Sequence, residues 1–313
     1  MKLATTTSDF YGLQDNVPAR LVELYGPTGF RCLDYSFYNV LHPGSSYLQP
    51  GDSWRREVED ALAAAQKLGV TFVQAHAPDG EHFCSGERRD ALLLATRRSI
   101  EGCALLGISN LVVHAAQLPD PESTPAEFIR ENIRFYRQLL PDAERFGVNL
   151  LVENSCEQNI PGYYLRTGRE MREFLQQAGH PLLHACWDTG HAHLRGMDQY
   201  QSLRELGEEL YALHIHDNCG DKDAHILPFM GSCNFDQVLQ ALKDMNYSGC
   251  FTLECSSGLR QRDGWPYSRQ RFTYRGREVE TLLDPPERLR QRYVQLMYET
   301  GRYMLEQYGL FEE

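Results

Sequence analysis

One phrase recurs along this chain: an amphipathic, helix-like stretch, a glycine, an apolar or β-branched run, and then a polar residue. It is seen in AAAQKLGVTFVQAH, ALLGISNLVVH, AERFGVNLLVE and LQQAGHPLLHACWD. The glycines of these segments are Gly69, Gly107, Gly147 and Gly179, and their spacings of 38, 40 and 32 residues suit one strand and one helix per unit. Glycine just past a helix end supplies the left-handed cap conformation. Such alternation indicates parallel strands joined by crossover helices.

The number of these units decides the architecture. Strand-like runs lie at residues 2–6, 31–36, 70–76, 109–114, 148–153, 183–188, 210–216 and 249–255. The predicted helices include Ser53–Leu68, Pro125–Phe146 and Glu287–Tyr308. Eight strands separated by helices favour a (β/α)₈ barrel over an open doubly wound sheet, because no Gly-x-Gly-x-x-Gly follows any strand. We therefore predict an α/β fold, a single (β/α)₈ TIM barrel domain over residues 1–313, with residues 256–286 as a long loop over the C-terminal face and a terminal helix after it.

The alternation within the strands predicts which side chains face the barrel axis. In a barrel strand, one face points to the helices and is apolar, while the other points to the axis. Val73 and Ala75 are expected to face the helices, with Gln74 and His76 facing inward. The same alternation places further polar residues inward at the C-terminal ends of their strands, namely His114, Glu153, Asp188, His216 and Glu254. Barrel enzymes keep their active sites at that end.

The segment Tyr211–Gly231, YALHIHDNCGDKDAHILPFMG, adds further candidate ligands. It holds three histidines and three aspartates directly after a short apolar run. Asp223 and His225 form an Asp-x-His pair, which places a carboxylate and an imidazole within reach of one ion. A single inward His or Glu is more often a hydrogen-bonded rim residue than a ligand. Several carboxylates converging on one mouth would repel one another unless protons or a cation compensate them, and a divalent metal ion is the economical explanation.

Taken together and in order, these motifs resemble the xylose-isomerase-like barrels, a superfamily that includes sugar isomerases and epimerases and the endonuclease-IV-type apurinic endonucleases. The resemblance covers roughly residues 1–256. It rests on V-x-A-H ending at His76, V-V-H at His114, L-V-E-N at Glu153, W-D-T-G-H at residues 187–191, H-I-H-D at His216, D-x-H at Asp223 and L-E at Glu254.

The resemblance implies two different sets of metal ligands. In the tagatose-3-epimerase-like members, one metal is held by residues that match Glu153, Asp188, His216 and Glu254, and the residue matching His191 touches substrate. In the endonuclease branch, three zinc ions are held by residues that match those five together with His76, His114, Asp223 and His225. This chain keeps all nine positions, so ligand identity alone does not choose the branch. The second set, His76, His114, His191, Asp223 and His225, is expected either to complete a multinuclear site or to line the substrate pocket. One departure is that the Gly-Glu-Gly common after the Asp-x-His segment is replaced by Met230-Gly231-Ser232-Cys233.

The function that this resemblance implies first is a metal-dependent sugar isomerase or epimerase. It would move a proton between adjacent carbons of a ketose, an aldose or a related polyol through an enediolate, with Glu153 and Glu254 as the catalytic bases. Carboxylate-rich ligands suit Mn²⁺ or Mg²⁺ and the additional imidazoles suit Zn²⁺, with Co²⁺ a further candidate cofactor. One alternative is an endonuclease-IV-type zinc phosphodiesterase that acts on abasic DNA; another is a non-catalytic, metal-stabilised barrel. The formal net charge of −12 disfavours a protein whose main task is binding a phosphate backbone.

The expected partner is therefore a small-molecule sugar or sugar derivative, with nucleic acid disfavoured, no membrane, and a second copy of the chain left open. The first residues, MKLATTTSDFYG, contain no apolar signal segment, and no run approaches the roughly 18 apolar residues of a membrane span. A cytoplasmic location is the expectation. Residues 256–286 are rich in arginine and aromatic side chains, and they are expected either to pair with acidic groups or to form a lid over the mouth.

Overall fold

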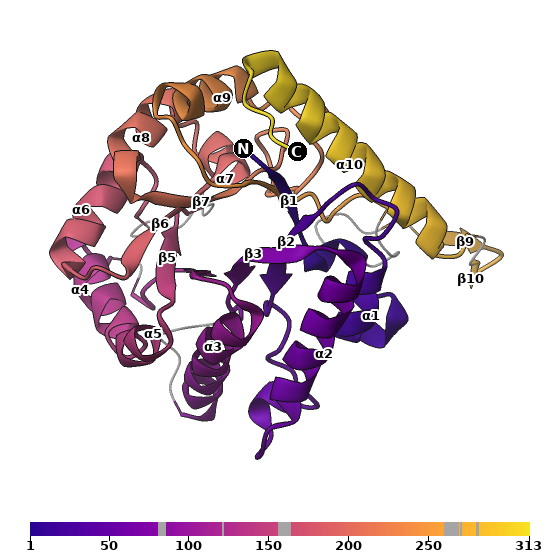
Figure 1. Cartoon of the computed structure of the whole chain (residues 1–313), viewed down its shortest axis with the longest axis horizontal. Coiled ribbons are helices and arrows are strands. Elements are labelled where there is room, and N and C mark those ends of the chain that lie inside the picture. The colour runs from indigo at the N-terminus through magenta and orange to yellow at the C-terminus, as the bar shows by residue number, and fades with distance from the viewer. Residues whose placement is uncertain (81–85, 121, 156–163, 260–268, 270, 280–281) are drawn as a thin grey trace.

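Eight parallel strands surrounded by helices form the core of the chain in a computed structural model. The structure describes residues 1–80, 86–120, 122–155, 164–259, 269, 271–279 and 282–313. The strands are β1 (Leu3–Thr6), β2 (Cys32–Ser36), β3 (Thr71–His76), β4 (Asn110–Val113), β5 (Asn149–Glu153), β6 (Leu183–Asp188), β7 (Leu210–His214) and β8 (Phe251–Leu253). Their order in the sheet, β7-β6-β5-β4-β3-β2-β1-β8, follows the chain and brings its two ends together. Figure 1 shows the helices forming a ring around the strands. The predicted (β/α)₈ barrel is confirmed.

The ring consists of helices of very different lengths. They are α1 (Pro18–Glu23), α2 (Ser53–Leu68), α3 (Glu87–Leu106), α4 (Pro125–Tyr136), α5 (Leu140–Phe146), α6 (Gly168–Ala178), α7 (Thr189–Leu194), α8 (Gln199–Leu206), α9 (Phe235–Asp244) and α10 (Glu287–Tyr308). Among the helices described, none is both long and apolar enough to cross a bilayer. The helix predicted over Pro125–Phe146 is in fact α4 and α5, because Pro141 cannot supply an interior backbone N–H and instead lies in the first turn of α5.

The barrel closes between β7 and β8 through one short seam. There, Ile215 and Leu253 form an isolated parallel bridge just beyond the end of β7. The Ile215 amide donates to the Thr252 carbonyl at 2.8 Å, and the Glu254 amide donates to the Ile215 carbonyl at 2.9 Å. His216 and Glu254 therefore lie directly beside this seam.

Side-chain alternation sorts the strand residues into two buried layers. Leu111, Leu150, Trp187 and their alternating neighbours pack in the large core between strands and helices, as predicted. Inside the barrel, a separate cluster takes one residue from each of β4 to β7: Val112, Leu151, Cys186 and Ala212. This inner layer lies directly below the polar residues at the C-terminal ends of the strands.

The prediction for Val73 is wrong. The pairing of β2 with β3 shifts register between Leu33 and Asp34, so that Leu33 lies opposite Phe72 and Asp34 opposite Gln74. Phe72 packs edge-on against Tyr35 in the helix-facing core with ring centroids 5.3 Å apart, whereas Val73 is only half-buried. Because the bulge adds one residue to β3, the side chains before it lie on the opposite face of the strand from the one that strict alternation predicts. Beyond it, Gln74 is buried as the alternation requires.

The segment predicted as a long loop contains a small antiparallel hairpin, β9 (Phe272–Tyr274) and β10 (Arg277–Val279), which extends past the first turn of α10 (Figure 1). Two of its arginines pair within the segment, since Arg269 lies 2.7 Å from Asp284 and Arg271 lies 3.0 Å from Glu278. Residues 260–268, 270 and 280–281 lie outside the described residues. The lid over the mouth therefore stays a prediction.

Asp9, which follows β1, makes stability depend on pH. Burial raises the pKa of this carboxyl from 3.8 to about 7, although hydrogen bonds from Thr5 at 2.7 Å and Tyr25 at 3.3 Å favour the charged form. An acid whose pKa is higher in the folded state stabilises the fold below its unfolded pKa of about 4, and this contribution is lost as pH rises through 7. Because of Asp9, we expect the unfolding free energy of the wild type to fall by roughly 3 to 4 kcal/mol between pH 4 and 8. Asp9→Asn should not show this fall.

Urea unfolding of wild type and Asp9→Asn at several pH values between 4 and 8 measures this difference. The test is how the difference in unfolding free energy between the two proteins varies with pH, because burial of the uncharged amide costs the same at every pH. Parallel stability profiles for the two proteins would contradict the assignment.

Candidate metal centre

The strand ends bring the predicted ligands to one mouth of the barrel. Glu153 ends β5 and Asp188 ends β6, while His216 lies two residues after β7 and Glu254 follows β8 directly. Glu153, Asp188 and His216 are each at most 4% exposed. Glu254 is more open, with a side chain 19% exposed against 2% for Glu153. The site therefore has a buried floor and one carboxylate facing outward.

Three of the four predicted ligands gather around a different histidine. Glu153, Asp188 and Glu254 offer ligand atoms that lie, together with one nitrogen of His214, within 4.8 Å of one another. Nδ1 of His214 lies 2.6 Å from Oε1 of Glu153 and 3.6 Å from Oε2 of Glu254. His216 joins this group through Asp188, because its Nε2 lies 3.0 Å from Oδ1 of Asp188.

His216 also belongs to a second group with His191, Asp223 and His225, whose ligand atoms again lie within 4.8 Å of one another. Asp223 is the centre of this group. Its Oδ2 lies 3.4 Å from Nε2 of His191 and 3.2 Å from Nε2 of His225, and its Oδ1 lies 3.5 Å from Nε2 of His216. The predicted Asp-x-His pair therefore faces two histidines from other strand ends.

His76 and His114 form a third group with Glu153. Nε2 of His114 lies 2.6 Å from Oε2 of Glu153, and the two histidine Nε2 atoms are 3.0 Å apart. All nine candidate residues thus occupy one continuous cluster of three groups: two of them share Glu153, and the contact between Asp188 and His216 links the third.

Neighbouring carboxylates and histidines in this cluster stabilise each other's charged forms. Burial opposes ionisation of Glu153, but His214 and His114 hold the pKa of this carboxyl well below its usual range. Burial likewise opposes the charged form of Asp223, and His225 and His191 outweigh it and hold its pKa well below the usual range. In return, the pKa of His225 rises to about 10, because Asp223 and Glu254 outweigh the effect of burial. The carboxylates of Glu153 and Asp223 are therefore ionised and available as ligands at neutral pH.

The local backbone explains the W-D-T-G-H motif. Asp188 is the N-cap of α7, and its Oδ1 accepts a hydrogen bond of 2.7 Å from the His191 amide. Asn154 clamps the same turn, since it donates to the Asp188 carbonyl at 2.9 Å and accepts from the Asp188 amide at 2.6 Å. A Cβ atom at Gly190 would lie 1.9 Å from Cε1 of His216, so only glycine leaves room for that imidazole.

The donor atoms themselves fit a divalent metal ion. Four buried atoms of the cluster are in no hydrogen bond of good geometry with the described residues: Oε2 of Glu153, Oδ2 of Asp188, Nε2 of His216 and Oδ1 of Asp223. Three of them lie within ion-pair distance of another candidate ligand, at 2.6 to 3.5 Å. Buried carboxylates and imidazoles without such partners are costly in a low-dielectric site. A mixed set of carboxylate and imidazole donors is what Zn²⁺ and Mn²⁺ accept in proteins.

A family comparison identifies this arrangement. The profile of the family described as xylose isomerase-like TIM barrel matches residues 28–274. The chain belongs to this family. The resemblance predicted from the motifs is thereby confirmed.

Several relatives are found in both branches of the xylose isomerase-like family. An uncharacterized protein of Methanocaldococcus jannaschii is 26% identical over 227 residues, 71% of this chain and 75% of that protein. A ketose 3-epimerase of Arthrobacter globiformis is 25% identical over 204 residues, 64% of this chain and 65% of the epimerase. A probable endonuclease 4 of a Geobacter strain is 29% identical over 175 residues, 51% of this chain and 59% of that protein. The chain thus spans less than two thirds of the length of the latter two relatives.

Among solved structures, the chain is similar to the IolI protein with a bound zinc atom, at a TM-score of 0.70 and 18% identity, with all of both chains covered. It is also similar to a D-psicose 3-epimerase solved in the presence of D-fructose, at a TM-score of 0.69 and 17% identity, covering 97% of this chain and 99% of that one. These likenesses support the fold.

Three residues of the site are not among the ligands predicted from the sequence: His214, which the alternation of residues 211–216 puts on the same inward face as His216, and Asp34 and Tyr38. His214 lies on the inward face of β7 and contacts Glu153, and its Nε2 lies 3.3 Å from Oδ2 of Asp34 on β2. Asp34 in turn accepts a 2.7 Å hydrogen bond from Gln74. Alternation puts His214 on the inward face, because Leu213 and Ile215 flank it, and the same signal could have found Asp34 between Leu33 and Tyr35. Tyr38 could not be found in this way, since it lies beyond β2, where its ring stands edge-on to His76 at 5.2 Å.

Proposed function

We propose that this member of the xylose isomerase-like family is a divalent-metal-dependent sugar isomerase or epimerase that moves a proton between adjacent substrate carbons. The observation that carries the proposal is the placement of Glu153 and Glu254, whose carboxylates approach the same nitrogen of His214 from two different strands. Two carboxylates that face one small space can remove a proton and return one. The epimerase relatives support the choice of substrate class.

The roles of the two glutamates follow from their surroundings. His114 and His214 keep Glu153 ionised, which is the form in which a general base accepts a proton. Glu254 is the more exposed of the two and can exchange its proton with solvent. His191 is held by a 2.8 Å contact between its Nδ1 and the Asn154 carbonyl, so its Nε2 is directed toward Asp223 and the mouth, where it would bind a substrate oxygen.

The metal would be held by Glu153, Asp188, His216 and Glu254, as the resemblance implies, and His214 lies close enough to these carboxylates to be an alternative nitrogen ligand. Bound there, a divalent ion would act as a Lewis acid that lowers the cost of negative charge on neighbouring sugar oxygens. The donor set, and the zinc in the IolI structure, favour Zn²⁺ or Mn²⁺.

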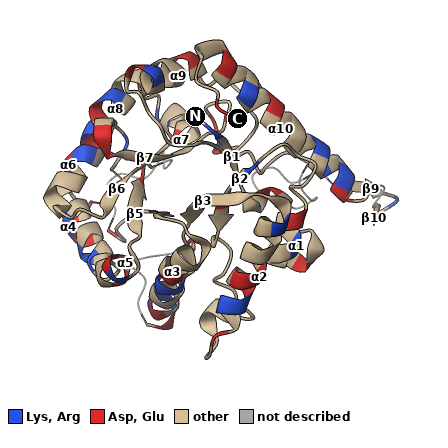
Figure 2. Ribbon diagram, in the orientation of Figure 1, with Lys and Arg blue, Asp and Glu red and all other residues tan. Residues whose placement is uncertain are grey.

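The second candidate is a zinc phosphodiesterase acting on abasic DNA. The group formed by His191, His216, Asp223 and His225 favours it, as does the likeness to endonuclease 4 proteins. The charge distribution weighs against it. Net charge is −12, and Figure 2 shows basic and acidic residues interspersed over the helical ring of the described chain.

One experiment separates the two candidates. Protein loaded with Mn²⁺, Co²⁺ or Zn²⁺ is incubated in D₂O with ketoses, aldoses, inosose-type cyclitols and their phosphates, and in parallel with an abasic duplex. We expect deuterium at a substrate carbon and no strand cleavage. Cleavage of the duplex with three zinc ions per chain would establish the nuclease, and no exchange with any sugar would refute the isomerase.

A further inference from the structure

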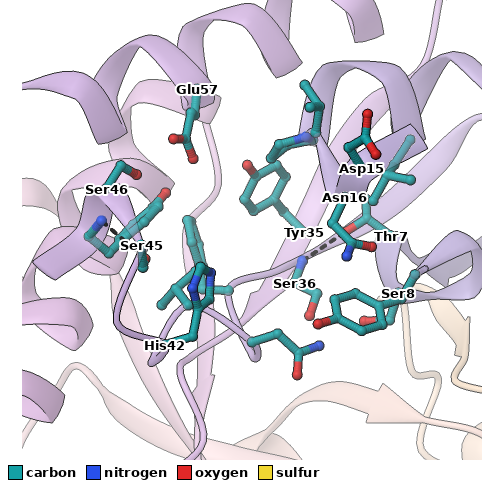
Figure 3. A pocket seen from close by; sticks show the side chains of 18 of the residues that line it. Thr7, Ser8, Asp15, Asn16, Tyr35, Ser36, His42, Ser45, Ser46 and Glu57 are labelled. Carbon is teal, nitrogen blue, oxygen red and sulfur yellow. Dashed lines mark hydrogen bonds between the residues drawn. The ribbon is translucent and has the colours of Figure 1, made fainter. Parts of the chain in front are cut away.

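A cavity with a volume of about 500 Å³ lies beside the barrel mouth. Figure 3 shows it between the segments that follow β1 and β2 and the first turns of α2. None of the nine candidate metal-centre residues lines it. Its lining contains acidic and aromatic residues but neither lysine nor arginine, including Asp15, Tyr35, Phe37, Tyr47 and Glu57. The cavity therefore has aromatic walls and two carboxylates, with His42 in its lining and the guanidinium of Arg98 bound to the backbone carbonyls of Ser46 and Tyr47.

Glu57 brings a carboxylate to this cavity without a counter-charge. It lies in the first part of α2, is half-buried, and is in no hydrogen bond or ion pair with the other described residues. Figure 3 shows its carboxylate and the hydroxyl of Tyr35 directed toward the same space. Burial, followed by the charge of Glu57, raises the pKa of Tyr35. Burial, followed by Tyr35 and Glu57, raises the pKa of Tyr47, and Arg98 opposes this rise.

Tyr47 adds an unpartnered hydroxyl. The residue is only 3% exposed, and its buried Oη has no hydrogen-bond partner among the described residues. A buried hydroxyl without a partner costs about 1 to 3 kcal/mol, so a ligand that satisfies it gains affinity. The ring itself is fixed, because Phe37 packs against Tyr47 at 5.7 Å and against Tyr35 at 4.7 Å between ring centroids. The two phenols are thus held in place before any ligand arrives.

We propose that this cavity binds the primary ammonium group of a small organic molecule. An ammonium group has three N–H donors and no acceptor, which matches the Glu57 carboxylate and the two phenol oxygens. The aromatic faces add cation–π attraction. An anion is disfavoured by Glu57 and Asp15, and a neutral hydroxyl compound would leave the charge of Glu57 without a partner.

Propylammonium is the probe, and propan-1-ol is its neutral match of similar size. Binding to the metal-loaded full chain is measured at pH 7.5 by ligand-observed NMR titration. We expect propylammonium to bind and propan-1-ol to bind at least roughly tenfold more weakly, because charge-assisted hydrogen bonds are the stronger ones. Tetramethylammonium keeps the charge without N–H donors and is expected to bind several-fold more weakly than propylammonium. Equal binding of propylammonium and propan-1-ol would refute the proposal.

Variants place the site. Glu57→Gln is expected to weaken propylammonium binding at least roughly tenfold, and Tyr47→Phe several-fold. Glu59→Gln is the matched control, because Glu59 is exposed on the same helix and does not line the cavity. Thermal unfolding checks that each variant folds, and Tyr35→Phe replaces Tyr47→Phe if the latter does not. Unchanged affinity in Glu57→Gln would overturn the assignment.

Discussion

Replacing Glu153 or Glu254 with glutamine is expected to lower hydrogen exchange between substrate carbon and solvent by about 10² to 10⁴-fold, the usual contribution of a positioned base. Glutamine keeps the size of the side chain and one ligand oxygen but cannot accept the proton. Exchange is compared at saturating metal, because each variant also removes one charged ligand and is expected to bind the ion more weakly. The measurement pairs deuterium incorporation, followed by NMR, with elemental analysis of the same preparations.

The chain offers a matched control for these variants. Glu209 on the outer surface also contacts a histidine, with its Oε2 2.8 Å from Nδ1 of His184. Glu209→Gln removes the same kind of carboxylate–imidazole contact far from the mouth and should leave exchange unchanged. If Glu153→Gln and Glu254→Gln both retain metal and wild-type exchange, the glutamates are ligands only and the proposed reaction is wrong.

Asp188→Asn is expected to lower metal affinity by about 100-fold or more, since it removes a charged ligand at the point where two groups meet, and even supporting residues cost 10 to 100-fold. The fold should persist. Asparagine caps helices as well as aspartate does, so the bond from the His191 amide can remain. Elemental analysis after dialysis, and thermal unfolding with and without chelator, measure the effect.

Asp198→Asn is the control for capping alone, because Asp198 caps α8 by accepting a 2.9 Å bond from the Gln201 amide and lies outside the cluster. It should change neither metal content nor the stabilisation by metal. Should Asp188→Asn retain stoichiometric metal under the same dialysis, the assignment of Asp188 as a ligand would be refuted.

The sequence was most informative where one rule applied many times. Glycine caps such as Gly69 marked the helix ends, and the apolar and polar alternation of β5 placed Glu153 correctly at the mouth. The same rule failed at Val73, because one extra residue in β3 changes the alternation and a bulge cannot be recognised in the sequence of an apolar run. The grouping of His214 with Glu153, and of His216 with Asp223, depends on ring orientation and on distances across the barrel. Those quantities arise only when distant strands meet, so no spacing along the chain contains them.

The single bridge that closes the barrel has a consequence for local unfolding. Among the described residues, every other neighbouring pair of barrel strands shares a ladder, whereas β7 and β8 are joined by the isolated bridge between Ile215 and Leu253 and its two backbone hydrogen bonds. This seam is where the cylinder should open most readily, and His216 and Glu254 stand on its two sides. A metal ion bound by both residues would link β7 and β8 across this seam. The amides of Ile215 and Glu254 should therefore exchange with deuterated solvent quickly in chelator-treated protein and slowly once metal is bound, which couples loading of the site to closure of the whole barrel.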